Sequence, residues 1–289
     1  MKYVFIQEHR RDFTVKKMAE TLKVSRGGYY QWAKQGFKTR RQLKSEYYTG
    51  LVKLEFERSR RTYGPRRLAR QILKMHGIRI GRRCVEELMR ENNLVPKTVR
   101  KFKATTNSNH NYPTSPNLLS QNFKMARVNQ AWVSDITYIA TGEGWLYLAA
   151  VMDLYSGKIV GWAMEERMTQ ELVISALRQA VKRHRPPRGV LLHSDRGVQY
   201  ACKRYRNLLR SHGFVQSTSR KGNCWDNAPM ESFFGTLKTE LVYHEHYKTR
   251  AEARRSIFDY VEGFYNRIRL QQKLGYLSPI EFEKLSLVA

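Results

Sequence analysis

The sequence predicts an α/β protein: a mixed five-stranded sheet with helices packed on it, preceded by an all-α region. Three observations lead to this prediction. The first hundred residues hold two basic stretches with helical periodicity. A stretch rich in Asn, Thr, Ser and Pro then interrupts the pattern. After it, the order of elements is strand, strand, strand, helix, strand, helix, strand, helix, which is typical of a mixed sheet.

The first predicted helix pair lies in "TVKKMAETLKVSRGGYYQWAK". Ser25 is placed to cap its second helix, because a serine side chain can accept from the unpaired backbone N–H groups of a helix start. The apolar residues recur at helical spacing, as Val15, Met18, Leu22, Tyr29 and Trp32.

The second predicted pair lies in "YGPRRLARQILKMHGIRIGRRCVEELMRENNL". Pro65 suits the first helical position and Gly77 the helix stop. The residues expected to face inward are Leu68, Ile72, Leu73, Val85, Leu88 and Met89.

A short helix, a tight turn and a second helix with outward arginines, here Arg82, Arg83 and Arg90, are typical of a helix-turn-helix. An ordinary helical hairpin with a solvated basic face gives the same pattern, and the charge of the chain favours the DNA-binding interpretation. Glu86 and Glu87 argue against insertion of the whole second helix into a major groove.

The charge indicates a polyanionic partner. The chain carries 53 Lys and Arg against 25 Asp and Glu, a net charge of +28, and residues 1–103 hold 28 of the basic and 9 of the acidic residues. Nucleic acid is therefore the expected partner, with phosphates gripped mainly by the first region, and an anionic membrane surface is a weaker alternative. No apolar stretch is long enough for a membrane span and no secretory signal begins the chain, so we expect a cytoplasmic protein.

The three cysteines, Cys84, Cys202 and Cys224, are scattered and predict neither a zinc site nor a disulfide framework. Residues 104–123 are expected to be a linker between the basic helical region, 1–103, and the mixed region, 124–289.

The mixed region carries the strand signals. Three β-rich stretches, "AWVSDITYI", "WLYLAAVMDLYSG" and "KIVGWAM", are joined by tight turns, and "GVLLHSD" and "FVQSTS" supply the fourth and fifth strands. Near the C-terminus, Thr249 and Glu252 make a capping box. The helix that follows is expected to bury Ile257, Val261, Phe264 and Ile268.

Three acids stand apart from the surface acids: Asp135 within the first strand, Asp195 at the end of the fourth, and Glu231 in the first turn of the helix after the fifth. Strands one and four can lie side by side in such a sheet. The three carboxylates would then repel one another in an apolar setting, and a divalent cation would relieve that repulsion. Each acid alone has an ordinary explanation: a bulge residue, a turn residue, or a partner of the helix dipole. The combination on these elements favours a metal site.

Such a site predicts phosphoryl-transfer chemistry with Mg²⁺ or Mn²⁺, and with two ions for an in-line displacement. Lys238 lies two helical turns after Glu231, on the same helix face, where it could hold a phosphate. Asp153 is expected to be a turn residue, and His193 to pack or hydrogen-bond near the site.

Three blocks, "WVSDITYI", "LLHSDRGVQY" and "KGNCWDNAPMESFFGTLKTEL", resemble the integrase core of DDE transposases. More closely, nearly the whole chain resembles the OrfB-type transposases of bacterial insertion sequences with two overlapping reading frames. Asp195 and Glu231 are separated by the 35 residues that this pattern requires.

The resemblance implies a ribonuclease-H-like fold with Asp135, Asp195 and Glu231 as the metal-binding catalytic triad. It implies that Lys238 contacts the transposon end and that Asn223 and Asn227 shape the site. Family members often have a His after the Arg that is Arg269 here, so packing is the expected role of that block. The residues expected to contact DNA are Lys238, Asn223, Asn227, Arg82, Arg83, Arg66 and Arg67.

The resemblance also implies the reaction: nicking at the ends of the element exposes a 3′ hydroxyl, which attacks another phosphodiester. The expected partners are double-stranded DNA, the upstream-frame product and further copies of this chain. Two alternatives stay open: a nuclease of the same fold that cleaves RNA–DNA hybrids, and a non-catalytic DNA-binding accessory that needs fusion to the upstream product. The second is favoured by the lack of a sustained heptad repeat for assembly.

Overall fold

A computed structural model describes residues 1–97, 115–220 and 224–286 of the chain. The chain divides into two compact units, Met1–Val95 and Pro96–Ala289. No helix in the described ranges is both long and apolar enough to cross a bilayer.

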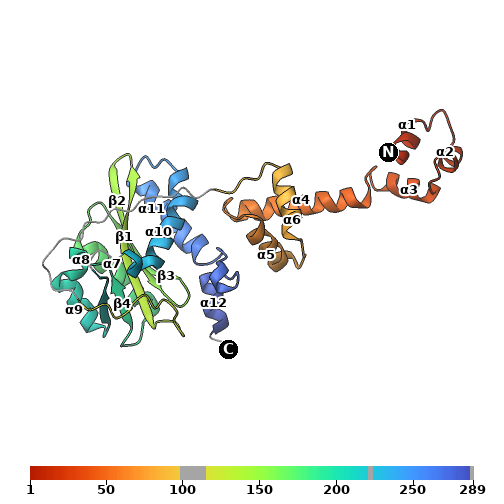
Figure 1. Ribbon diagram of the computed structural model, residues 1–289. Helices are drawn as coiled ribbons and strands as arrows, with labels where there is room; N and C mark the ends of the chain where they lie inside the picture. The colour runs from red at the N-terminus through yellow and green to blue at the C-terminus, as the bar shows by residue number, and fades with distance from the viewer. Residues whose placement is uncertain (98–114, 221–223, 287–289) are drawn as a thin grey trace. The chain divides into compact units, whose positions relative to one another are not determined.

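The first unit is entirely helical in its described elements (Figure 1). They are α1 (Lys2–Glu8), α2 (Val15–Thr21), α3 (Arg26–Lys34), α4 (Arg40–Arg58), α5 (Pro65–His76) and α6 (Arg82–Glu91). Helices α1–α3 share a small core in which Ile6, Met18, Tyr29 and Trp32 are buried. Ser25 caps α3 by accepting from the backbone N of Gly28, as predicted.

The predicted second pair is α5 and α6. Helix α5 begins at Pro65 and ends at Gly77, whose φ of 67° is the left-handed conformation that favours glycine at a helix end. The predicted inward residues Leu68, Ile72, Val85, Leu88 and Met89 are buried. The prediction that Leu73 faces inward is wrong, because its side chain is 38% exposed. It lies about 100° further round the helix than Ile72, and Gln71 is buried in its place.

Helix α4 was not predicted. It buries Leu51, Val52 and Phe56 only in its second half, where it packs on α5 and α6. The first half has few apolar residues and none that is fully buried, so the sustained apolar period that identifies an amphipathic helix is missing there.

The second unit is built on the predicted mixed five-stranded sheet, which the structure confirms. Its strands are β1 (Ala131–Thr141), β2 (Gly144–Asp153), β3 (Ile159–Glu165), β4 (Leu191–Ser194) and β5 (Val215–Thr218). Their order across the sheet is β3-β2-β1-β4-β5. The pairs β1–β2 and β2–β3 are antiparallel, and β1–β4 and β4–β5 are parallel. The hairpins thus form one half of the sheet, and the helical crossovers the other.

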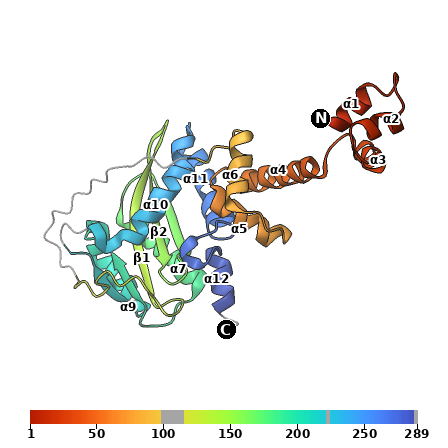
Figure 2. The same cartoon turned by 45° about the vertical axis from the view of Figure 1, so that its right-hand side comes forward.

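Helices cover the sheet (Figures 1 and 2). The α-helices are α7 (Gln170–His184), α8 (Val198–Ala201), α9 (Lys203–Ser211), α10 (Ala228–Glu240), α11 (Arg250–Phe258) and α12 (Pro279–Ser286). Short turns η1 (Cys224–Asn227), η2 (Val242–His244) and η4 (Gln272–Leu274) are 3₁₀-helical, and η3 (Asp259–Tyr265) is π-helical.

The two sheet faces have different partners. Helix α7 packs on β2 and β3, in a core with Trp132 of β1 and Ala149 and Val151 of β2. Because side chains alternate along a strand, Asp135 lies on the other face from Trp132. Helix α10 packs against β1, as the view in Figure 2 also shows.

The capping box of Thr249 and Glu252 at the start of α11 is confirmed. The predicted core stripe is correct for Ile257, Val261 and Phe264 but wrong for Ile268, which is 44% exposed. The cause is the π-helical turn η3, because a π-type turn shifts the helix face and ends the α-helical period on which the stripe was based.

The segment expected to be a linker is not free along its described part. Residues 98–114 lie outside the described residues, but from residue 115 onward the chain packs on the sheet. The backbone N of Leu118 and that of Leu119 both donate to Ser217 Oγ of β5, and Leu119 is buried. This packing was not predicted, because Leu118 and Leu119 lie in a stretch whose composition is otherwise typical of a loop.

Candidate active site

Two of the predicted acids come directly after the last residues that pair β1 with β4. The parallel register of β1 and β4 pairs Ser134 with Ser194, so Asp135 and Asp195 come next on adjacent strands. Each carboxylate is oriented by its own backbone: Asp135 Oδ1 accepts from Ile136 N at 2.8 Å, and Asp195 Oδ1 accepts from Gly197 N at 2.9 Å. The turn leaves no spare room at Gly197, where an added Cβ would lie 3.1 Å from Asp195 Oδ1.

Helix α10 brings Glu231 to the same place. Glu231 is in the first turn of α10, and the residue before that helix, Asn227, donates from Nδ2 to the carbonyl of Ser134 at 3.3 Å. This bond ties the start of α10 to β1 one residue before Asp135. The three acids, far apart along the chain, are therefore neighbours in the fold.

The electrostatics of Asp135 reflect this arrangement. Burial raises the pKa of Asp135 well above its ordinary value, and the negative charge of Asp195, with a smaller effect of Glu231, raises it further. The backbone bond from Ile136 and the positive charge of Lys238 oppose this shift of the pKa. Partial burial also raises the pKa of Glu231. A carboxylate in this setting is stabilised by an added positive charge.

The side-chain oxygens near Asp135 suit a hard divalent cation, although they are not arranged as a complete metal site. Among the residues described, no three His, Cys, Asp or Glu side chains are arranged to hold a metal ion as they stand. The neighbouring oxygens are carboxylates, the ligands that Mg²⁺ and Mn²⁺ prefer. Asn227 adds a further oxygen, because its Oδ1 is buried and is not reached by a hydrogen-bond donor in the described part of the chain. The residues present thus fit a divalent metal.

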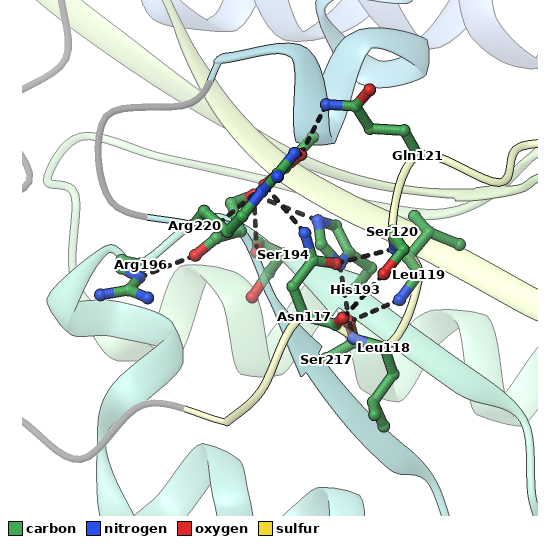
Figure 3. Close-up of polar contacts among 12 residues, drawn as sticks. Asn117, Leu118, Leu119, Ser120, Gln121, His193, Ser194, Arg196, Ser217 and Arg220 are labelled. Carbon is green, nitrogen blue, oxygen red and sulfur yellow. Dashed lines mark hydrogen bonds and ion pairs between the residues drawn. The ribbon is translucent and has the colours of Figure 1, made fainter.

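A second polar network supports the start of α10 (Figure 3). Its centre is Asp226 of η1, which is fully buried. Asp226 Oδ2 accepts from Asn117 Nδ2 at 2.8 Å and from the backbone N of Arg220 at 2.8 Å. Asp226 Oδ1 accepts from Gln121 Nε2 and from Arg220 Nη2, both at 2.9 Å. These bonds hold together three segments that meet just before Glu231.

His193 packs and hydrogen-bonds within the fold, as expected. It is fully buried, with Nδ1 2.8 Å from Ser217 Oγ and Nε2 3.1 Å from Ser219 Oγ (Figure 3). Burial lowers the pKa of His193 to about 4, so the ring is neutral at pH 7. Asp153 is also confirmed as a turn residue, accepting from the backbone N of Ser156.

Lys238 reaches toward Asp135 from two helical turns beyond Glu231. Burial lowers the pKa of Lys238, and the charge of Asp135 raises it. The Lys238 ammonium also lies 4.8 Å from the centre of the Tyr138 ring. Asn227 is only 5% exposed, and its Nδ2 donates to the carbonyl of Ser134, so it is placed to position β1 and α10. Asn223 lies outside the described residues.

In the first unit, the predicted DNA contacts lie at the starts of two helices. Arg82 and Arg83 are exposed in the first turn of α6, and Arg66 is exposed in that of α5. Arg67 is half-buried, with its guanidinium 5.7 Å from the centre of the Tyr63 ring. Arg82 also pairs with Glu86 at 3.8 Å.

The Asp226 network was not predicted from the sequence. Arg220 and Asp226 both lie in or beside "RKGNCWDNA", and opposite charges six residues apart across a loop were the one available signal. The sequence held no signal that Asn117 or Gln121 would contact Asp226, because each is more than 100 residues from it along the chain. The aromatic partner of Lys238, Tyr138, was also missed.

Three family models match parts of the chain. Residues 125–224 and 231–287 match models of the integrase core domain, and residues 49–102 match a model of an HTH-like domain. The integrase-core match and the strand order together confirm the predicted ribonuclease-H-like class. This family suggests the use of a divalent metal, and the two kinds of domain together imply DNA binding.

Two relatives cover almost the whole chain. The "Insertion element IS600 uncharacterized 31 kDa protein" of Shigella sonnei is 48% identical over 92% of this chain and 97% of its own. "Transposase InsF for insertion sequence IS3A" of Escherichia coli (strain K12) is 41% identical over 99% of this chain and 100% of its own.

Solved structures are more distant. The HTLV-2 integrase catalytic core domain in complex with magnesium is 16% identical, covers 55% of this chain and 98% of that chain, and has a TM-score of 0.43. A likeness this weak does not bear on function. The full-length identity to the insertion-sequence relatives does: the chain belongs to the family of DDE transposases with an integrase core that insertion sequences of the IS3 type encode.

Proposed function

We propose that this transposase cleaves and joins DNA at the ends of its insertion sequence with Asp135, Asp195 and Glu231 as the metal-binding catalytic residues. The observation that carries the proposal is the parallel register of β1 and β4, whose last pair is Ser134 and Ser194, so that Asp135 within β1 and Asp195 just after β4 are the next residues on adjacent strands. The bond from Asn227 to Ser134 then keeps the helix of Glu231 beside them.

The three carboxylates would hold two divalent ions, Mg²⁺ or Mn²⁺. When bound, such ions supply activation of the attacking oxygen and stabilisation of the leaving oxygen in a displacement at phosphorus. Lys238, on the Glu231 helix and within the field of Asp135, would hold a phosphate of the transposon end.

The reaction needs no covalent bond to the protein. In the first step water attacks a phosphodiester at the end of the element, the P–O3′ bond breaks, and a free 3′ hydroxyl is left. In the second step that hydroxyl oxygen forms a bond to a target phosphorus, the P–O3′ bond of the target breaks, and the target 3′ oxygen takes up the proton. One phosphodiester replaces another, so no external energy source is required.

The first unit would bind the DNA. Its phosphate contacts would be made by Arg66, Arg67, Arg82 and Arg83. The charge of these four side chains, and the exposure of Arg66, Arg82 and Arg83 at the starts of α5 and α6, support this. We expect action in the bacterial cytoplasm on nucleoid DNA, as an oligomer and together with the upstream-frame product.

A joining assay tests the proposal. Labelled duplex carrying the inverted repeat that flanks the gene is incubated with Mg²⁺ or Mn²⁺ and the chain, with and without the fused upstream product. Asp195→Asn and Glu231→Gln are each expected to abolish nicking and joining, while DNA retention in a filter assay persists. Glu165→Gln is the matched control, because it removes an exposed carboxylate charge at the end of β3, at the edge of the sheet.

Joining that survives Asp195→Asn or Glu231→Gln would refute the triad. Joining that requires the fused product in every reaction would support the alternative function, a DNA-binding accessory, for the free chain. Cleavage of an RNA–DNA hybrid in preference to the transposon end would favour the nuclease.

A further inference from the structure

Three exposed aromatic side chains lie close together at Lys238, on the helix that carries Glu231; together with Lys238 we call them the aromatic cluster. Tyr138 of β1 is 41% exposed, Trp145 of β2 is 50% exposed and Tyr243 of η2 is 45% exposed. The Tyr138 and Trp145 rings meet edge to face, with their centroids 4.9 Å apart. Burial raises the pKa of Tyr243, and the nearby Tyr138 hydroxyl raises it further.

The register explains how the Tyr138–Trp145 pair forms. Tyr138 is opposite Tyr147 in the antiparallel β1–β2 pair, so Trp145 is its diagonal neighbour on the same sheet face. The pairing of β1 with β4 ends at Ser134, and this part of β1 extends beyond it. Two large rings therefore stand at the open end of the sheet, where packing does not require them to be aromatic.

The hairpin that carries these rings is held firmly. The backbone N of Gly142 donates to Tyr247 O at 2.9 Å, and a Cβ at Gly142 would lie 2.5 Å from Lys248 O. Arg250 adds two bonds: its backbone N donates to Glu143 Oε2 at 2.8 Å, and its Nε donates to Trp145 O at 3.2 Å. A platform that is already ordered loses little entropy when a ligand stacks on it.

Lys238 connects the cluster to the catalytic site. Its ammonium lies over the Tyr138 ring, and the charge of Asp135 acts on the same ammonium. A polyanion whose phosphate sits at Lys238 would place the adjoining base at Tyr138 and Trp145. Aromatic faces beside a cation are the combination by which proteins bind unpaired nucleotides independently of sequence.

From this juxtaposition we infer that the aromatic cluster is a stacking subsite for an unpaired nucleobase of the DNA strand that enters the catalytic site. The ligand class is a single-stranded nucleotide next to the reacting phosphate, with its base on the Tyr138–Trp145 pair and its phosphate at Lys238. The inference extends the proposed function and rests on it for the identity of the bound polymer.

Two other occupants are disfavoured by the features of the cluster. A base pair inside a duplex is stacked on both faces. A duplex would therefore contact the Lys238 ammonium but would not stack on the Tyr138 and Trp145 rings. A second copy of the chain would bring more positive charge to Lys238, because the net charge of each copy is +28.

Fluorescence of 2-aminopurine tests the inference with the full-length chain. The probe is a short duplex of arbitrary sequence with an unpaired 3′ end whose first unpaired base is 2-aminopurine, and no metal is added, so that no strand is cut. Wild type is expected to quench the probe and to bind it more tightly than a blunt duplex. Tyr138→Ala and Trp145→Ala are each expected to relieve the quenching and to weaken binding of the unpaired end about 5- to 150-fold, which corresponds to ~1–3 kcal/mol per stacked base.

Matched variants make the result specific. Phe258→Ala removes another exposed aromatic of the same unit, one that is 48% exposed and packs on Trp162, and it is expected to change nothing. Tyr138→Phe keeps the ring and is expected to retain the quenching. An abasic nucleotide in place of 2-aminopurine should weaken binding to wild type and have no further effect on the Tyr138→Ala/Trp145→Ala chain.

Equal binding of unpaired and blunt ends, or losses no greater than with Phe258→Ala, would overturn the inference. A change of sedimentation in the Ala variants without a change in quenching would assign the cluster to contact between copies, and would overturn it as well. Because binding is measured without metal, a wild type that stacks the base but never joins DNA refutes the proposed function alone. A wild type that joins DNA without stacking refutes only this subsite.

Discussion

The Asp226 network offers the sharpest test of how the site is held. We predict that Asp226→Ala lowers the free energy of unfolding of the integrase-core unit by about 3 kcal/mol, the low end of the ~3–5 kcal/mol for breaking a buried ion pair. Asp226 is fully buried and accepts from Asn117, Gln121 and three nitrogens of Arg220. The low end applies because the Arg220 side chain is 57% exposed and regains water when its partner is removed.

Thermal unfolding followed by near-ultraviolet circular dichroism measures this effect. For a unit of this size about 3 kcal/mol corresponds to a midpoint lower by roughly 6–12 °C. Asp226→Asn is the matched variant: it preserves the volume and loses the charge, so it is expected to fall between wild type and Asp226→Ala. A midpoint for Asp226→Ala within about 1 °C of wild type would refute the reasoning.

The pH dependence of the same variant gives a second check. The Arg220 side chain lowers the pKa of Asp226 below its ordinary value. A depressed carboxyl pKa contributes stability that is present above the unfolded-state pKa of about 3.9 and is lost as the pH falls through the folded-state pKa. The difference between wild type and Asp226→Asn should therefore be constant from about pH 6 to 8 and shrink only below about pH 4. A difference that grows on acidification would contradict this assignment.

Three further predictions concern the rest of the chain. Glu240→Ala should cost about 3–5 kcal/mol by urea unfolding, because Glu240 holds the buried Arg269 guanidinium by two bonds; an unchanged midpoint would count against it. Gly161→Ala should cost about 1–3 kcal/mol through overpacking, because the new Cβ would lie 2.4 Å from the backbone oxygen of Ala176. Its control is Gly235→Ala, which has open space and should not destabilise α10. Arg83→Ala should reduce the slope of log K against log salt for duplex binding by about 0.9, one phosphate contact, and an unchanged slope would remove Arg83 from the DNA interface.

Local features were predictable because neighbouring residues determine them. The caps of Ser25 and Thr249, the helix limits at Pro65 and Gly77, and the alternation of the strands each need only a few residues of context. The predictions that failed were of another kind. Leu73 and Ile268 have the right residue type for a core, but the pitch of one helix and the π-helical turn of another direct them outward.

The sequence itself thus determined which stretches are strands and their order along the chain. It also determined the two kinds of region, the excess of positive charge and the three candidate acids. Tertiary structure alone decided that Asn117 and Gln121 join Asp226, that Asn227 ties α10 to β1, and that Tyr138, Trp145 and Tyr243 gather beside Lys238. The physical reason is range. A cap or an amphipathic face is a contact between residues a few positions apart, whereas these contacts join segments up to 109 residues apart, and only the packing of helices on the sheet brings them together.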